Sequence, residues 1–125
     1  MRWEDHTADE ELFSSRIKLF AKKHLKELHY MNERMEKISV ALNSGADPDS
    51  MVRTTKWIHP EPDDIKAVGP SSKGMAVSRL YFYLDKPKNR IILLTLGTKK
   101  NKGEESKIIK EAQSVLRSYL EKQGV

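Results

Sequence analysis

Residues 77–103, VSRLYFYLDKPKNRIILLTLGTKKNKG, constrain the fold of this chain more than any other segment. Two runs rich in aromatic and branched aliphatic residues flank the turn sequence DKPKN, and the second run ends in a group of lysines. This pattern predicts a β-hairpin that turns at residues 85–89. An isolated hairpin is marginal in water, so other elements must cover at least one of its faces.

Side chains alternate between the two faces of a strand, so this turn sorts the hairpin residues into two sets. The set predicted to meet the helices pairs Leu84 with Arg90, Phe82 with Ile92 and Leu80 with Leu94. The opposite set pairs Tyr83 with Ile91, Tyr81 with Leu93 and Arg79 with Thr95, and Lys99 follows beyond Gly97. We expect this second face to be an open, concave surface of tyrosines and cations.

The chain before the hairpin predicts two antiparallel helices. Thr7 and Glu10 have the spacing of a capping box, and apolar residues then recur at helical intervals over residues 8–28. A second helix is expected from a cap at Asn32 to a stop at residues 43–45, which read Asn-Ser-Gly.

The remaining segments complete an α+β pattern. A short strand is expected within residues 1–5, and the prolines of residues 45–70 favour extended pieces at 51–59 and 63–68. A closing helix should start near Glu104, because acidic residues suit a helix N-terminus. The fold predicted is an N-terminal antiparallel helix pair packed on a small twisted antiparallel sheet, with a C-terminal helix.

Length and composition narrow the class of protein. The chain of 125 residues fits one domain, residues 1–125, and contains no cysteine, so neither disulfides nor thiolate metal ligands are available. No segment approaches the roughly 18 apolar residues of a membrane span. The start, MRWEDHTADEE, is acidic where an export signal would be basic and then apolar. We therefore expect a cytoplasmic protein without membrane contact.

Positive charge is concentrated around the hairpin. Residues 73–103 contain eight Lys and Arg against Asp85 alone, whereas the whole chain carries a formal net charge of only +5. A basic surface is typical of proteins that bind the phosphates of nucleic acids. The alternative is a solvated lysine rim that protects a sheet edge.

Four motifs follow one another between residues 63 and 120: DIKAVG, SRLYFYLD, RIILLTLGTKKNKG and ESKIIKEAQSVLRSYL. Together with the helical segments before them, they resemble the RelE/ParE superfamily of toxins, and especially its HigB-like, phage-derived branch. The resemblance implies a ribosome-dependent endoribonuclease that cleaves mRNA and is toxic when free. It also implies a cognate antitoxin protein, usually encoded beside the toxin, that forms a hetero-oligomer with it.

Metal-free RNA cleavage requires activation of a 2′-hydroxyl, stabilisation of the phosphorane and a proton for the leaving oxygen. Arg79 is the first candidate for the phosphate, because a planar guanidinium can hold two oxygens at once. Lys99 and Lys100 are the next catalytic candidates. The acid and base remain unassigned, since no histidine follows His59.

Further residues are candidates for RNA contact. The resemblance implies this role for Lys66 and Lys73, whose positions are similar to those of basic residues that touch the message in family members. Lys102 belongs to the same lysine group, and Tyr81 and Tyr83 could stack on bases or simply pack within the fold.

Structural alternatives stand beside these roles. Arg79 could pair with Asp64 or Asp85 instead of a phosphate. His59 and Asp63 could form a catalytic pair, but a capped turn explains them better. Tyr119 is expected in the core, although some relatives place a tyrosine from the C-terminal region in the active site.

Other site types have no support in the sequence. The four histidines lack metal-ligand spacing, and neither a phosphate-binding GxxxxGK[ST] loop nor a GxSxG elbow is present, so no metal and no cofactor is expected. Two functional alternatives to the ribonuclease stay open. One is a ParE-type poison that binds DNA gyrase, and the other is a catalytically inactive RNA-binding relative.

Overall fold

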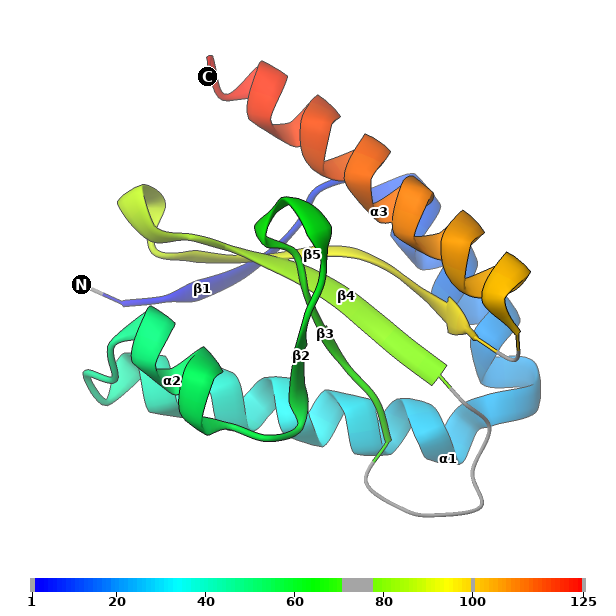
Figure 1. The fold of residues 1–125 in the computed structure, drawn as a ribbon, viewed down its shortest axis with the longest axis horizontal. Coiled ribbons are helices and arrows are strands. Elements are labelled where there is room, and N and C mark those ends of the chain that lie inside the picture. The colour runs from blue at the N-terminus through cyan, green and yellow to red at the C-terminus, as the bar shows by residue number, and fades with distance from the viewer. Residues whose placement is uncertain (1, 71–77, 100, 125) are drawn as a thin grey trace.

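The computed structural model describes residues 2–70, 78–99 and 101–124 and shows an α+β fold around a five-stranded mixed sheet (Figure 1). The strands are β1 (Glu4–Thr7), β2 (Ile58–Pro60), β3 (Lys66–Val68), β4 (Ser78–Asp85) and β5 (Arg90–Thr98). The helices are α1 (Glu10–Asn43), α2 (Pro48–Thr54) and α3 (Lys102–Lys122). Within the described residues, no helix combines the length and the apolar character needed to cross a membrane.

The predicted hairpin is confirmed as β4 and β5, but its turn is one residue shorter than expected. Asp85 pairs with Arg90, and a single 3-10 turn at Lys86–Lys88 followed by Asn89 joins the strands. Asn89 closes the turn in the left-handed conformation, with φ of 53°, which asparagine tolerates better than most residues. The predicted pairing of Leu84 with Arg90 is therefore wrong by one position.

A β-bulge changes the register again in the middle of the hairpin. Phe82 pairs with Leu93 and Tyr81 pairs with Thr95, so β5 carries one extra residue at this point. As a result Arg79 lies opposite Gly97 instead of Thr95, which was the predicted partner. Arg79 thus faces a strand position without a side chain.

The sheet is mixed, so the prediction of an antiparallel sheet is only partly correct. Strand order is β1-β5-β4-β3-β2, and β1 pairs with β5 in parallel, with Glu4 opposite Arg90. Strand β1 starts later than expected and is separated from β5 by most of the chain, so no local pattern could fix its direction. The other neighbouring strands pair antiparallel.

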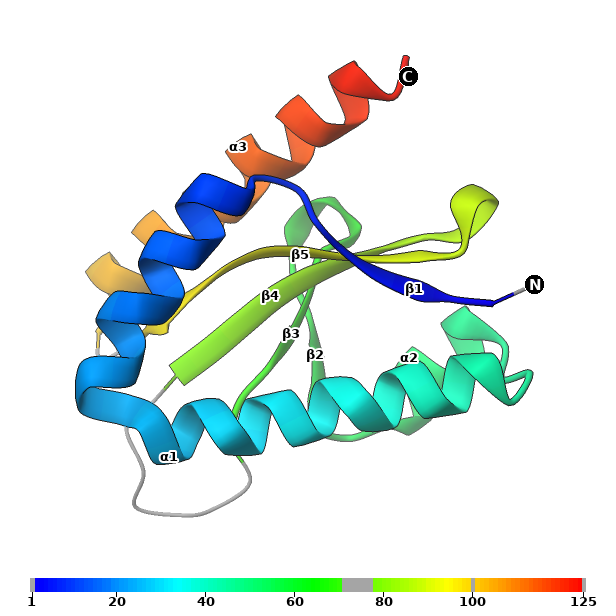
Figure 2. The ribbon, with the colours of Figure 1, turned by 180° about the vertical axis from the view of Figure 1, so that it is seen from behind.

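The expected antiparallel helix pair is instead one long helix with a bend. Helix α1 is interrupted only at His24, whose φ of −134° and ψ of 38° are non-helical, and it continues through the expected cap at Asn32. Figure 2 shows the two arms, residues 10–23 and 25–43, meeting at an elbow beside the sheet. Asp9 caps the helix through a 3.0 Å bond from the Leu12 amide, in place of the predicted Thr7.

Two segments between α1 and β4 differ from prediction in part. The extended piece expected at 51–59 is confirmed only at its end, in β2, because residues 48–54 form α2. Pro48 lies in the first turn of α2, and the Asp47 side chain accepts a hydrogen bond from the Ser50 amide at 2.9 Å. The extended piece at 63–68 is confirmed only as the three residues of β3. The closing helix is confirmed as α3, capped by Asn101 through the Glu104 amide at 2.9 Å.

Both faces of the sheet are covered, so the prediction of an open second face is wrong. The first core joins α1 to one face of the hairpin and includes Phe13, Phe20, Met31, Ile38, Leu80, Phe82, Leu84 and Ile91. The second core joins α3 to the other face and includes Ala67, Tyr81, Ile92, Leu94, Ala112, Val115, Leu116 and Tyr119. The apolar face of α3 packs against the aromatic side of the hairpin, so both surfaces are removed from water.

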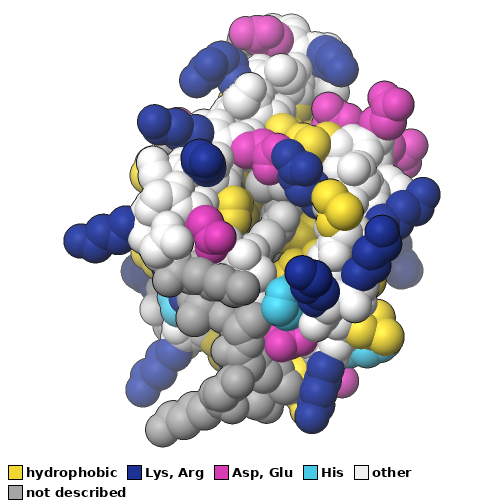
Figure 3. Space-filling model, turned by 90° about the vertical axis from the view of Figure 1, so that its right-hand side faces the viewer, with side chains coloured by type: hydrophobic (Ala, Val, Ile, Leu, Met, Phe, Trp, Pro, Cys, Tyr) yellow, Lys and Arg dark blue, Asp and Glu magenta, His cyan; other side chains and the backbone are white. Residues whose placement is uncertain are grey.

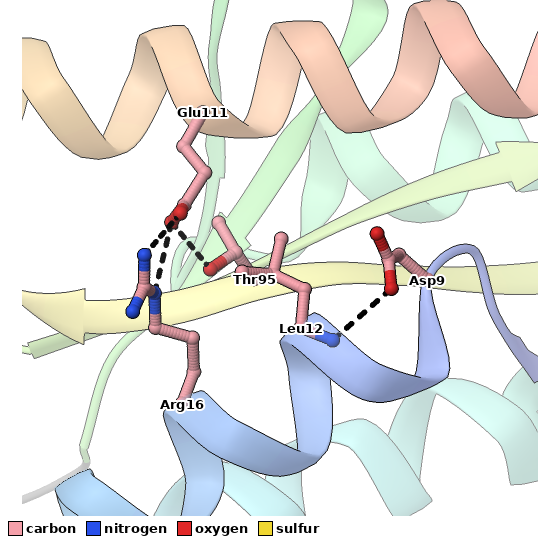
Figure 4. Close-up of polar contacts among 5 residues, drawn as sticks. All are labelled: Asp9, Leu12, Arg16, Thr95 and Glu111. Atoms are coloured by element: carbon pink, nitrogen blue, oxygen red, sulfur yellow. Dashed lines mark hydrogen bonds and ion pairs between the residues drawn. The ribbon is translucent and has the colours of Figure 1, made fainter.

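An ion pair fixes α3 over this second face (Figure 4). Arg16 Nε of α1 donates to Glu111 Oε2 of α3 at 3.3 Å, and Thr95 Oγ1 of β5 donates to the same oxygen at 2.9 Å. Burial alone would raise the pKa of Glu111, but the hydrogen bonds from Arg16 and Thr95 outweigh it and hold that pKa below its ordinary value. These contacts therefore hold α1, α3 and β5 together while Glu111 is ionised.

Candidate active site

Ionisable side chains that act on one another electrostatically gather where β3 ends and β4 begins. We call them the Arg79 cluster, which consists of Arg34 from α1, His59 from β2, Glu61, Arg79 from β4 and Lys99 just beyond β5. Arg79 lies over Gly69, where a Cβ atom would come within 2.6 Å of its Nη1. That nitrogen also donates to the Ser78 carbonyl at 2.9 Å. Gly69 is thus required for the guanidinium to rest against the end of β3.

Arg34 approaches the same point from the other side of the sheet. Its Nη1 donates to the Gly69 carbonyl at 3.0 Å, and its guanidinium lies 5.1 Å from the centre of the Trp57 ring, which is a cation–π contact. Burial and the positive charge of Arg79 both lower the pKa of Arg34. Two guanidiniums that repel each other beside one glycine form a site that an anion would stabilise.

His59 is the titratable group of the Arg79 cluster best suited to move a proton. It pairs with Ala67, which pairs in turn with Tyr81, so it shares a face of the sheet with Arg79. Burial lowers the pKa of His59, and the charges of Arg79, Lys99 and Arg34 lower it further. The imidazole is therefore neutral at pH 7 and can accept a proton.

Two carboxylates lie among these cations. Lys99 Nζ is 3.2 Å from Glu105 Oε1 of α3, and the exposed fractions of the two side chains are 22% and 33%. Burial raises the pKa of Glu61 and Glu105 raises it further, whereas Lys99 and Arg79 act in the opposite direction. The Arg79 cluster therefore has a net positive charge that its own anions only partly offset.

The structure brings together two of the predicted catalytic residues, Arg79 and Lys99. Both pairings offered as structural alternatives for Arg79 are wrong, because Asp64 forms an ion pair with Lys66 and Asp85 accepts a hydrogen bond from Tyr119. The third candidate, Lys100, lies outside the described residues, as does the RNA-binding candidate Lys73.

Lys66 is buried and lies on the opposite side of the sheet from Arg79. It pairs with Phe82 across the strands, which faces α1, and its ammonium is bound by the Asp64 carboxylate and carbonyl. Its predicted contact with RNA would require this ion pair to open. Lys102 is exposed at the start of α3.

The tyrosines behave differently from the predicted stacking surface. Tyr81 has no exposed area, since α3 covers its ring, so the prediction that it stacks on bases is wrong. Tyr83 is half-buried and packs against the same core. Tyr119 is confirmed as a core residue, and its hydroxyl donates to Asp85 Oδ2 at 2.7 Å.

Sequence reasoning missed Arg34 and Glu61 and set His59 aside. The three come from different segments, and only the pairing of β2 with β3 and the path of α1 bring them to Arg79. The suggested pair of His59 and Asp63 is not formed, because Asp63 Oδ2 accepts from Gln113 Nε2 at 2.9 Å. A histidine on a predicted strand, in a chain with a basic hairpin, was the available signal.

A groove adjoins the Arg79 cluster between α3 and the first arm of α1, and Figure 3 shows this hollow with Lys and Arg side chains around it. Its floor is residues 96–98 of β5, including Gly97, the partner of Arg79. We call it the α1–α3 groove; residues on its walls include Leu19, Lys22, Lys23, Lys107 and Ile108. Leu19 is 57% exposed and is one of the large apolar side chains that lie mostly in solvent, together with Leu25 and Val40.

Comparisons with protein-family models, with curated proteins and with solved structures find no match to this chain. Across residues 2–70, 78–99 and 101–124, no three His, Asp or Glu side chains gather as a metal ion would require. What the described part of the chain offers is a set of cations around a neutral imidazole, a combination that can bind a phosphodiester and remove a proton beside it.

Proposed function

We propose that this chain is the toxin of a type II toxin–antitoxin system and cleaves mRNA on the ribosome through the Arg79 cluster. The observation that carries the proposal is the convergence of Arg34, Arg79 and Lys99 around a neutral His59. This arrangement supplies a phosphate site and a proton acceptor within one set of side chains, without a metal. The resemblance to the RelE/ParE superfamily motivates the choice of mRNA as the substrate.

In the proposed reaction, Arg79 and Arg34 hold the scissile phosphate while neutral His59 accepts the proton of the adjacent 2′-hydroxyl. The 2′-oxygen forms a bond to phosphorus as the bond from phosphorus to the 5′-oxygen breaks. Lys99 and the guanidiniums stabilise the additional negative charge of the phosphorane. The leaving 5′-oxygen takes up a proton from solvent, and the His59 imidazolium returns its proton to solvent. The products are a 2′,3′-cyclic phosphate and a 5′-hydroxyl end, and no cofactor enters this step.

The proposal is tested by inducing the chain alone in bacteria and mapping mRNA 5′ ends. We expect growth arrest with new 5′-hydroxyl ends inside translated codons. Arg79→Ala should abolish both, because truncating a preorganised cation in an active site lowers rates by roughly 10²–10³-fold. Arg117→Ala is the matched control, since Arg117 is an exposed arginine on α3 outside the Arg79 cluster.

Other outcomes would contradict the proposal. Arrest with intact mRNA and damaged DNA would indicate a gyrase poison of the ParE type. RNA binding without arrest or cleavage would indicate an inactive relative. Equal loss of activity in Arg79→Ala and Arg117→Ala would mean that charge in general, and not the Arg79 cluster, is responsible.

A toxin needs an antitoxin, and the α1–α3 groove is the surface we propose for it. The groove combines exposed Leu19 and half-buried Ile108 with four cations, Arg16, Lys22, Lys23 and Lys107, against two carboxylates, Glu104 and Glu111. Its net positive charge suits an acidic amphipathic segment. The product of the neighbouring reading frame should co-purify with the wild type and be lost with Leu19→Asp. Unchanged co-purification would exclude the groove as the binding surface.

A further inference from the structure

The hydroxyl of Tyr81 is a buried polar group without a hydrogen-bond partner among the residues that the structure describes. The side chain has no exposed area and is held on strand β4 under α3. Leaving a hydroxyl desolvated and unpaired destabilises the folded state, so such groups are rare in folded proteins. A ligand that accepts a hydrogen bond from the Tyr81 hydroxyl would remove this destabilisation.

The position of this hydroxyl connects it to the Arg79 cluster. Tyr81 is two residues beyond Arg79 on the same face of β4, and its strand partner Ala67 is also the partner of His59. Burial raises the pKa of Tyr81, Glu61 and Glu105 raise it further, and Arg79 opposes them, so all three charges act on the hydroxyl. The group therefore remains protonated and is available as a hydrogen-bond donor.

We propose that the Tyr81 hydroxyl donates a hydrogen bond to an oxygen of the RNA phosphodiester bound between Arg79 and Lys99, which makes Tyr81 a substrate-binding residue of the site. This inference rests on the proposed function, because it takes RNA as the ligand. A phosphate oxygen fits the donor well, since an anionic acceptor gives a short, strong bond that repays the buried hydroxyl.

Access to the hydroxyl requires a side chain to move, and the Lys99–Glu105 pair is the part of the site best able to do so. Both side chains are long and partly exposed, and a single ion pair holds them together. An incoming phosphate competes with the Glu105 carboxylate for Lys99, and repulsion between the two anions drives Glu105 away. In the free protein Glu105 thus stays paired with Lys99 until an RNA phosphate takes the place of the carboxylate.

The decisive variant is Tyr81→Phe, which removes only the hydroxyl and keeps the ring in its core. Affinity for a 2′-O-methyl RNA oligonucleotide, which cannot be cleaved, is measured by fluorescence anisotropy at one fixed salt concentration. We expect affinity to fall roughly ten- to a hundredfold, because a hydrogen bond to a charged acceptor is lost. The melting temperature should stay unchanged or rise, because the hydroxyl has no partner to lose in the free protein.

Tyr119→Phe is the matched control, since its hydroxyl is bonded to Asp85 and lies in the same core. It should lower the melting temperature and leave RNA affinity unchanged. Equal affinities of the wild type and Tyr81→Phe would overturn the inference and assign the hydroxyl to an ordered water only. A wild type that does not bind the oligonucleotide would also overturn it.

The inference and the proposed function can fail separately. Weaker binding by Tyr81→Phe, in a protein that yields no new mRNA ends in cells, would support the phosphate contact and contradict the nuclease. New mRNA ends at wild-type level with Tyr81→Phe, combined with unchanged affinity, would support the nuclease and remove Tyr81 from its site.

Discussion

The two ends of the β4–β5 hairpin carry similar numbers of cations but treat them differently. At the turn, Lys86 pairs with Asp49 at 2.7 Å, Lys88 contacts Gln123, and both lysines are exposed. At the open end, Arg79 and Lys99 are half-buried and converge with Arg34 and His59. The lysines at the turn are solvated and make separate contacts, whereas the cations at the open end surround one neutral imidazole.

This contrast explains how a lysine-rich stretch divides into structural and functional parts. In the sequence the cations of residues 73–103 form one run, yet a hairpin separates its turn from its ends by the full length of the strands. Near the turn, buried Asp85 accepts from Tyr119, so this region stabilises the fold. Charge density along the chain therefore does not identify a binding surface; convergence in space does.

The largest effect is expected at His59, which belongs only to the open end. His59→Gln should lower RNA cleavage by roughly 10²–10⁴-fold, the usual contribution of a general base. Because the pKa of His59 lies below its ordinary value of 6.5, wild-type activity should hold at pH 7 and fall as acid protonates the imidazole. Single-turnover cleavage rates measured across pH check both statements.

The electrostatic origin of the lowered His59 pKa can be tested without measuring RNA cleavage. In Arg79→Gln, loss of a nearby positive charge should raise the pKa of His59, as followed by NMR titration of its imidazole protons. Lys86→Gln is the control, since Lys86 belongs to the turn. If the pKa of His59 stayed the same in Arg79→Gln and rose in Lys86→Gln, the two ends of the hairpin would not differ in their effect on the imidazole.

A smaller effect, on stability, is expected near the turn. Tyr119→Phe removes the 2.7 Å bond to Asp85 and should lower the free energy of unfolding by about 1–3 kcal/mol, because a buried carboxylate loses a donor. Urea denaturation measures the change, and Tyr81→Phe, whose hydroxyl is unpartnered among the described residues, should show none. If the two variants were equally destabilised, the hydroxyl of Tyr81 would have a structural partner.

The smallest effect is expected at the exposed turn itself. Lys86→Ala breaks the ion pair with Asp49, but both side chains are solvated, so stability should stay within the error of a urea titration. RNA cleavage should also be unchanged. A loss of cleavage comparable to that of Arg79→Ala would show that RNA contacts the whole basic hairpin.

Local patterns predicted most elements but not their pairing. The hairpin, the closing helix and the stop near residue 43 are confirmed, because turn residues, helical periodicity and caps act over a few positions. The bend at His24 was missed, since an apolar stripe continues through it in the sequence. The bulge beside Tyr81 was missed as well, because one extra residue leaves no mark in a run of apolar side chains.

The fold class, the hairpin and the placement of Arg79 and Lys99 at its open end could be predicted from the sequence, because these features follow from short-range patterns and strand alternation. Other features are visible only in the folded protein: α3 covers the tyrosine face, Gly69 makes room for Arg79, and Arg34 and His59 lie near it. These features depend on contacts between residues far apart in the chain. These contacts form when β2 pairs with β3 and when α1 and α3 pack on the sheet. Local sequence preferences do not determine which distant side chains come together.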